Sequence, residues 1–154
     1  MKKTTFVLTA LLCAASTSFA ADNFGTAADA EALVGKLVKA VAANHAAAYK
    51  EVTAKDPKWV HGDLYPLVID LKGVMLSHGA DEKLIGKEQY DLHDIDGKAF
   101  VKGYIEATKA KGKSWTDYKY TDPVTKKALP KSLYCEKVSL KSGDVVACAG
   151  IYKR

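Results

Sequence analysis

The chain has 154 residues, of which 48% are hydrophobic and 27% are charged, and its formal net charge is +5. This length accommodates one domain with one core. The composition is that of a soluble globular protein rather than of a disordered or membrane-embedded one. Because the lysines are scattered and are not interleaved with aromatic residues along one helix, the sequence gives no support for nucleic-acid binding.

The first 20 residues have the three parts of a secretory signal peptide. Lys2 and Lys3 are basic, residues 6–15 are apolar, and residues 18–20 (Ser-Phe-Ala) form a small-x-small cleavage site. We predict cleavage after Ala20, which leaves residues 21–154 as a single ligand-binding domain. Its formal charge falls from +5 to +3 because two lysines leave with the leader.

Two other interpretations of the leader are weaker. A lipoprotein would need a small residue before Cys13, and Leu12 stands there. An uncleaved anchor would need about 20 apolar residues, which neither the leader nor any later segment provides. The mature protein is therefore expected to be free in the periplasm, without a membrane span.

Cys135 and Cys148 remain as an even pair in an oxidising compartment, where a disulfide is the default. Residues 141–144 (Lys-Ser-Gly-Asp) have turn chemistry, and a hairpin that pairs Ser139 with Asp144 places the two cysteines opposite each other. A redox or metal pair is the alternative. It lacks a C-x-x-C motif and a neighbouring histidine.

Thr26 to Lys55 has the pattern of one long helix. Thr26 can cap it, with Asp29 as the capping-box partner, and Asp56 followed by proline ends it. We expect His45, in the middle of this helix, to be exposed. The apolar residues that recur at helical spacing are Ala30, Leu33, Val34, Leu37, Val41, Ala48 and Val52.

A hairpin is predicted next, with strands at 64–71 and 74–78 joined by a two-residue Lys-Gly turn. In that register Leu67 lies opposite His78, and both share a face with Tyr65. Pro66 predicts that this strand lies near an edge of the sheet.

Residues 79–97 are expected to be irregular. The acidic run at 91–97 suggests a calcium loop, but neither starting point supplies the oxygen ligands that an EF-hand requires. Asp96 is better explained as the cap of a second helix, Lys98 to Lys111.

Three strands close the chain, at 114–120, 132–138 and 145–152. The last one (VVACAGIY) is apolar on both faces, as a central covered strand should be. The sequence therefore predicts an α+β domain, in which a long N-terminal helix packs on a five-stranded antiparallel sheet that also carries a second short helix.

The stretch Gly112 to Tyr134 places aromatic residues on two strands around a proline-bounded loop. This stretch, together with four other segments, resembles the single Cache domain of the second type. Its sequence is GKSWTDYKYTDPVTKKALPKSLY, and the other segments are the long helix, YPLVIDLKGVMLSHG, DIDGKAFVKGYIEA and VVACAGIY. That family comprises PAS-like extracytoplasmic sensor modules of bacterial chemoreceptors and histidine kinases.

The resemblance implies a Cache-like sheet with a small ligand, often a short organic acid, bound on one face and the long helix on the other. It also implies a role in signal transduction or chemotaxis. Sensor Cache domains are normally followed by a membrane helix and a signalling module, which this sequence does not show, so we expect the domain to act through a membrane receptor or kinase as partner. No cofactor is expected. The positions that match the ligand-binding pattern are Tyr65, His78, Trp115, Tyr118, Lys131 and Tyr134.

Strand alternation conflicts with part of this set, because it places Trp115 and Tyr118 on opposite faces unless a bulge intervenes, and likewise Lys131 and Tyr134. The alternatives to a ligand-binding role are sheet packing for the aromatic residues and a surface position for Lys131.

A second possible function is that of an envelope inhibitor or assembly factor without a small ligand, which fits the small size and the disulfide. No catalytic motif or metal-ligand spacing suggests an enzyme.

Overall fold

A five-stranded antiparallel sheet separates two helices in the computed structural model, which describes residues 24–154. The predicted leader lies outside these residues. The elements are α1 (Ala27–Thr53), β1 (Pro66–Asp70), β2 (Met75–His78), the 3-10 turn η1 (Glu82–Leu84), α2 (Phe100–Lys111), β3 (Lys113–Thr121), β4 (Ala128–Val138) and β5 (Val145–Tyr152). The strand order is β2-β1-β5-β4-β3.

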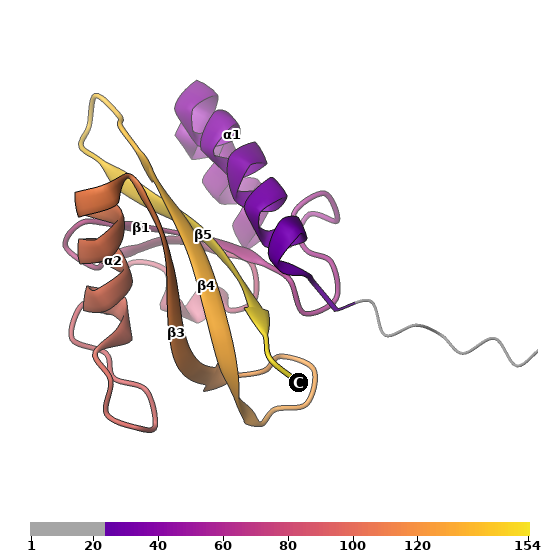
Figure 1. Cartoon of the computed structure of the whole chain (residues 1–154). Helices are drawn as coiled ribbons and strands as arrows, with labels where there is room; N and C mark the ends of the chain where they lie inside the picture. Colours follow the sequence, from indigo (N-terminus) through magenta and orange to yellow (C-terminus); the bar gives the residue numbers. More distant parts are fainter. Residues whose placement is uncertain (1–23) are drawn as a thin grey trace, which may run out of the picture.

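Each face of the sheet is covered by one helix, with α1 on one side and α2 on the other (Figure 1). Two hydrophobic clusters result, one under each helix. β5 is the central strand and is almost entirely buried, as its apolar sequence predicts. The predicted fold class is confirmed. Among residues 24–154, neither helix has a stretch long and apolar enough to cross a membrane.

The start of α1 has the predicted capping box. The Asp29 amide donates to the Thr26 hydroxyl at 3.2 Å, and the Asp29 carboxylate accepts from the Thr26 amide at 2.9 Å. All seven residues of the predicted apolar stripe are buried, and His45 is exposed. The helix is nevertheless kinked at Asn44, whose φ of −156° and ψ of 89° are not helical. The Asn44 side chain accepts from the Ala47 amide at 3.1 Å and so caps the second half of the helix.

The hairpin has the predicted pair of Leu67 and His78. Its turn differs from the prediction, because a bulge after Val68 pairs Ile69 with Met75. The Asp70 carboxylate accepts from the backbone amides of residues 72 and 74 and holds a wider turn than the two-residue one expected.

Pro66 is the first residue of β1, which lies beside the edge strand β2, as expected for a strand near an edge, and its missing N–H is tolerated at the start of the strand. Another expectation is wrong. Asp96 does not cap α2, which begins at Phe100 without a side-chain cap. The loop before α2 is held by Asp94, which accepts from three backbone amides, while Asp96 pairs with Lys119 at 2.9 Å.

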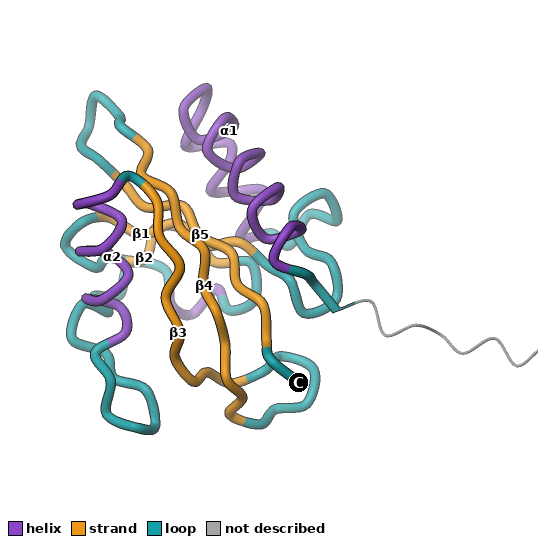
Figure 2. Tube along the Cα trace, viewed as in Figure 1, coloured by secondary structure: helices purple, strands orange, loops and turns teal. Residues whose placement is uncertain are grey.

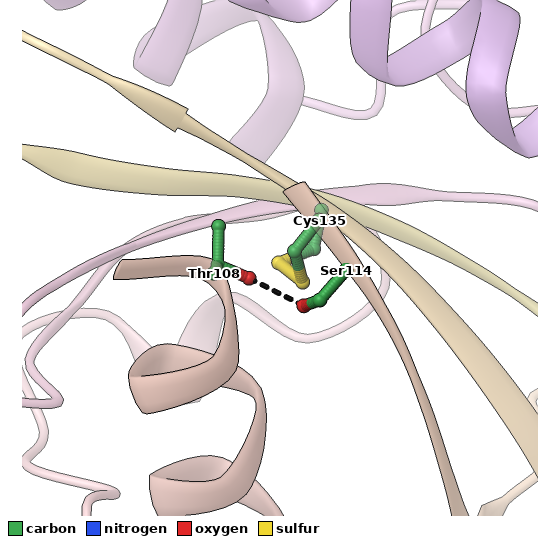
Figure 3. Close-up of a disulfide and its surroundings, with 4 residues drawn as sticks. Thr108, Ser114 and Cys135 are labelled. Atoms are coloured by element: carbon green, nitrogen blue, oxygen red, sulfur yellow. Dashed lines mark hydrogen bonds between the residues drawn. A yellow bond between two sulfur atoms is a disulfide. The ribbon is translucent and has the colours of Figure 1, made fainter. Parts of the chain in front are cut away.

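The last two strands have the predicted register, and Cys135 and Cys148 are paired and joined by a disulfide. Figure 3 shows the bond beside α2, next to the 2.7 Å hydrogen bond between the hydroxyls of Thr108 and Ser114. β4 begins at Ala128, four residues earlier than predicted. This extension adds pairs with β3 and sets Lys131 firmly within the strand.

Candidate functional site

Lys131 is the most unusual side chain of the sheet, because its ammonium is buried without an acidic partner. It lies on the α2 face of β4 and is 1% exposed. Its Nζ donates to the hydroxyls of Tyr65 at 2.8 Å and Tyr152 at 3.4 Å. Among the described residues it forms no ion pair within 4 Å.

Aromatic rings surround this ammonium. Nζ lies 4.1 Å from the ring centroid of Tyr65, 4.5 Å from that of Tyr152 and 5.7 Å from that of Tyr120. The electron-rich faces of these rings attract a cation but replace water only in part. Burial therefore lowers the pKa of Lys131 from 10.5 to about 7, although the charges of Asp63 and Asp122 act in the opposite direction.

The side chain of Lys131 passes directly over Gly150 of the neighbouring strand β5 and depends on the absence of a side chain there. A Cβ atom at this position would lie 2.7 Å from Cε of Lys131 and 2.9 Å from the carbonyl oxygen of Ser132. Only glycine leaves room for the lysine stem, so Gly150 lets the ammonium reach Tyr65.

His78, at the end of β2, is held as a neutral hydrogen-bond donor. Its Nδ1 accepts from the backbone amides of Ala80 at 3.2 Å and Asp81 at 2.9 Å. Burial and the nearby charge of Lys131 lower the pKa of His78 to about 4. The imidazole is therefore neutral at pH 7, and its single proton is assigned to Nε2.

Stacked aromatic residues form the wall next to these polar groups. The rings of Phe100 and Tyr118 are parallel, with centroids 4.3 Å apart, and Tyr120 lies 5.9 Å from each. The ring centroids of Tyr65 and His78 are 5.1 Å apart. The site thus joins an apolar surface to a set of hydroxyl, imidazole and ammonium donors.

A cavity of about 710 Å³ opens above these groups. Tyr65, His78, Phe100 and Tyr120 form its floor, and its border comes from the connections before α2 and between β3 and β4, which are drawn largely as loops in Figure 2. A second, inner cavity of about 20 Å³ adjoins Tyr118 and the same aromatics, with room for about one water molecule. Lys131 lies behind the floor, in contact with Tyr65.

The mouth of the cavity has apolar and basic side chains. Leu92 is 40% exposed and Ile95 is 75% exposed, and both line the cavity. Lys119 there is paired with Asp96, whereas Lys126 has no ion pair among the described residues. A bound molecule would cover the two apolar residues.

Four of the six residues that the sequence predicts for the site come together on the α2 face. Tyr65 and His78 line both cavities, Tyr118 lines the inner one, and Lys131 contacts Tyr65. Tyr65 immediately precedes β1, and the other three groups lie on β2, β3 and β4, so they meet only because the sheet brings these strands together.

Trp115 and Tyr134 lie on the other face, as strand alternation predicts. Their ring centroids are 5.1 Å apart, and Tyr134 belongs to the cluster under α1. Trp115 donates from Nε1 to Glu31 of α1 at 3.2 Å, and the Tyr134 hydroxyl donates to Glu136 at 2.8 Å. Neither side chain lines the cavity of the α2 face.

Sequence reasoning missed Phe100, Tyr120, Tyr152 and Gly150 as parts of this site. A signal existed for Tyr152, because the register that pairs the two cysteines also pairs Lys131 with Tyr152. Tyr120 is two residues from Tyr118 and so shares its face. Within the described residues, no group of three or more His, Cys, Asp or Glu side chains could hold a metal ion.

Comparison with known proteins gives one family. A family model described as Single Cache domain 2 matches residues 16–152. The structure of a methyl-accepting chemotaxis protein from Vibrio parahaemolyticus RIMD 2210633 is 27% identical, with 81% of this chain and 86% of that chain covered and a TM-score of 0.67. No curated protein matches the sequence.

Two more distant structures have the same fold. One is the periplasmic sensor domain of a chemotaxis protein, with 21% identity, 80% of this chain and 88% of that chain covered, and a TM-score of 0.62. The other is a Cache chemosensory domain solved as the structural basis for its carboxylic acid recognition. It has 21% identity, 79% and 84% coverage, and a TM-score of 0.62.

Proposed function

Because the chain belongs to the Single Cache domain 2 family, we propose that it is a periplasmic sensor module that binds a small carboxylic acid. The observation that carries this proposal is the buried ammonium of Lys131, which has phenol hydroxyls but no carboxylate as partners. An anion supplied by the ligand would provide the missing negative charge.

Electrostatics favour an acid over an amine as ligand. A carboxylate bound against Tyr65 would lie about 6 Å from the lysine nitrogen, where an effective dielectric constant of about 20 gives an attraction of about 3 kcal/mol. Nε2 of His78 and the hydroxyl of Tyr120, which both line the cavity, can donate to the same carboxylate. A cationic ligand would be repelled by the same lysine.

The shape of the site favours a short carbon skeleton. The inner cavity has room for about one water molecule, and the stacked rings of Phe100 and Tyr118 form an apolar wall beside it. Leu92 at the mouth extends this wall outward. One of the structural neighbours recognises a carboxylic acid, which agrees with this ligand class.

The cellular place of the module is part of the proposal. We propose cleavage of the leader after Ala20 and release into the periplasm, where the disulfide between Cys135 and Cys148 would form. The signal would pass to a partner protein, a chemoreceptor or a histidine kinase. Mass spectrometry of the protein from a periplasmic extract tests the cleavage site, and copurification from the same extract tests the partner.

A thermal-shift comparison of matched acids and amides tests the ligand class. Purified residues 21–154 are heated with acetate, propionate, pyruvate or lactate and with the corresponding amides. An acid at about 100 times its Kd should add about 2.7 kcal/mol of stability, whereas its neutral amide should add much less. Equal shifts with acid and amide, or no shift with any acid, would contradict the proposal.

Two variants make this test specific. Lys131→Met removes the ammonium and keeps an apolar chain of similar length, so the response to acids should disappear. Lys113→Met is the matched control, because Lys113 is an exposed lysine of β3. It should respond to acids as the wild type does.

A further inference from the structure

The charged groups around Lys131 leave its ammonium without a counter-charge. The acidic side chains whose charges act on Lys131 are Asp63 before β1 and Asp122 after β3, and both are buried and bound to Arg154. The guanidinium of Arg154 reaches Asp63 at 2.6 Å and Asp122 at 3.0 Å. These carboxylates are therefore already paired with a permanent cation.

The other elements that face Lys131 contribute neutral groups. They are Tyr65 before β1, Tyr118 and Tyr120 from β3, Tyr152 from β5 and His78 from β2; Tyr118 is paired with Lys131 across the two strands. Burial raises the pKa values of these tyrosines above 10, and the pKa of His78 is about 4. Lys131 is thus the group in this cluster that changes charge near neutral pH.

We propose that a carboxylate enters this site together with one proton, which the Lys131 amine takes up, so that binding weakens as the pH rises above neutrality. This inference rests on the proposed function, because it concerns the same site and the same ligand class. In the balanced step, the neutral amine gains a proton from solvent and becomes the ammonium that attracts the bound anion from behind Tyr65. In total, the site therefore takes up one carboxylate and one proton, which together have no net charge.

The direction of the pH effect follows from the two states of the amine. Without ligand the pKa of Lys131 is about 7, so most molecules carry a neutral amine at pH 8. A bound carboxylate favours the ammonium and raises this pKa. At pH 8 binding should take up about 0.9 proton, and Kd should rise roughly 20- to 30-fold between pH 7.5 and pH 9.0. Below pH 6 this dependence should vanish.

Calorimetry with propionate as the probe measures the proton directly. Titrations of residues 21–154 at pH 8 in buffers of different ionisation enthalpy give the number of protons taken up. A value near one supports the inference. If propionate binds without proton uptake and with the same Kd at pH 7.5 and 9.0, the inference is overturned while the proposed function stays intact.

NMR of lysine-labelled protein provides a test that needs no bound acid. One lysine Cε signal should titrate near pH 7 in the free protein, should be absent from Lys131→Met, and should titrate at a higher pH with saturating propionate. Titration near pH 10.5 in the free protein would overturn the inference. If no acid binds at any pH, the proposed function fails, and proton uptake fails with it.

A control addresses the other histidine of the cavity. His93 lines the mouth of this cavity. His93→Gln should keep both the proton uptake and the fold-change in Kd, because the window from pH 7.5 to 9.0 depends on Lys131. Loss of both effects in His93→Gln would show that they do not come from Lys131 and would overturn the inference.

Discussion

Replacing Lys131 with methionine should stabilise the ligand-free protein, and the gain should depend on pH. In the folded state the pKa of Lys131 is about 7, against about 10.5 for an exposed lysine. The unfolded chain therefore binds more protons between pH 7 and 10.5, and the wild type gains stability as the pH rises through this window. Above 10.5 the cost of burying the lysine vanishes, and below 7 it is fully present.

The size of this stability difference follows from the pKa values of Lys131 in the folded and unfolded states. At pH 7 the lysine costs the folded state about 4 kcal/mol relative to a neutral side chain, and at pH 9 about 2 kcal/mol. The variant also loses the hydrogen bond to Tyr65, worth about 1 kcal/mol. Lys131→Met should therefore be about 3 kcal/mol more stable than the wild type at pH 7 and about 1 kcal/mol more stable at pH 9.

Urea unfolding at both pH values measures these differences. The slope of free energy against urea should be the same for both proteins, so that the midpoints report stability alone. Lys113→Met, which changes an exposed lysine, should follow the wild type at both pH values. Parallel pH profiles of Lys131→Met and the wild type would refute the reasoning, because they would mean that Lys131 titrates as an exposed lysine does.

Three further predictions test the remaining parts of the account. Gly150→Ala should lower the free energy of unfolding in urea by about 1 to 3 kcal/mol and weaken acid binding, because the new Cβ would lie 2.7 Å from Cε of Lys131. The control is Gly103→Ala, whose Cβ would have no neighbour within 4 Å and which should be neutral or stabilising. Replacing Cys135 and Cys148 by serine should lower the free energy of unfolding by about 3 kcal/mol, given their separation of 13 residues, and a reductant should have the same effect on the wild type. Tyr65→Phe should raise Kd for propionate by calorimetry while the fold is kept, and an unchanged Kd would exclude the hydroxyl from the site.

Periodicity in the sequence was sufficient to predict the layers of the fold. The apolar stripe of α1 and the capping box at Thr26 depend on residues three or four positions apart, so they can be found locally. The register of the last hairpin also follows from one turn, and it places Cys135 opposite Cys148. The turn after β1 was mispredicted because Asp70 binds two amides and stabilises a bulged alternative.

The site was only half predictable. Alternation correctly separates Trp115 and Tyr134 from the face of Lys131, since side-chain direction depends on position along the strand alone. The cavity itself is formed where the loop that holds Leu92 meets Tyr120 and its neighbours on β3, which are far away in the sequence. Such a long-range contact leaves no periodic pattern in the sequence, and neither does the hydrogen bond of Asp94 that fixes the loop.

The account depends on the charge of one buried lysine, and calorimetric titration of three proteins at pH 7 tests it most directly. Propionate and propionamide are each titrated into the wild type, Lys131→Met and Lys113→Met. We predict that propionate binds the wild type and Lys113→Met with the same Kd, that Lys131→Met loses this binding at least tenfold, and that the amide binds none of them comparably. Equal binding of propionate to the wild type and Lys131→Met would contradict the assignment of Lys131 as the group that recognises the acid.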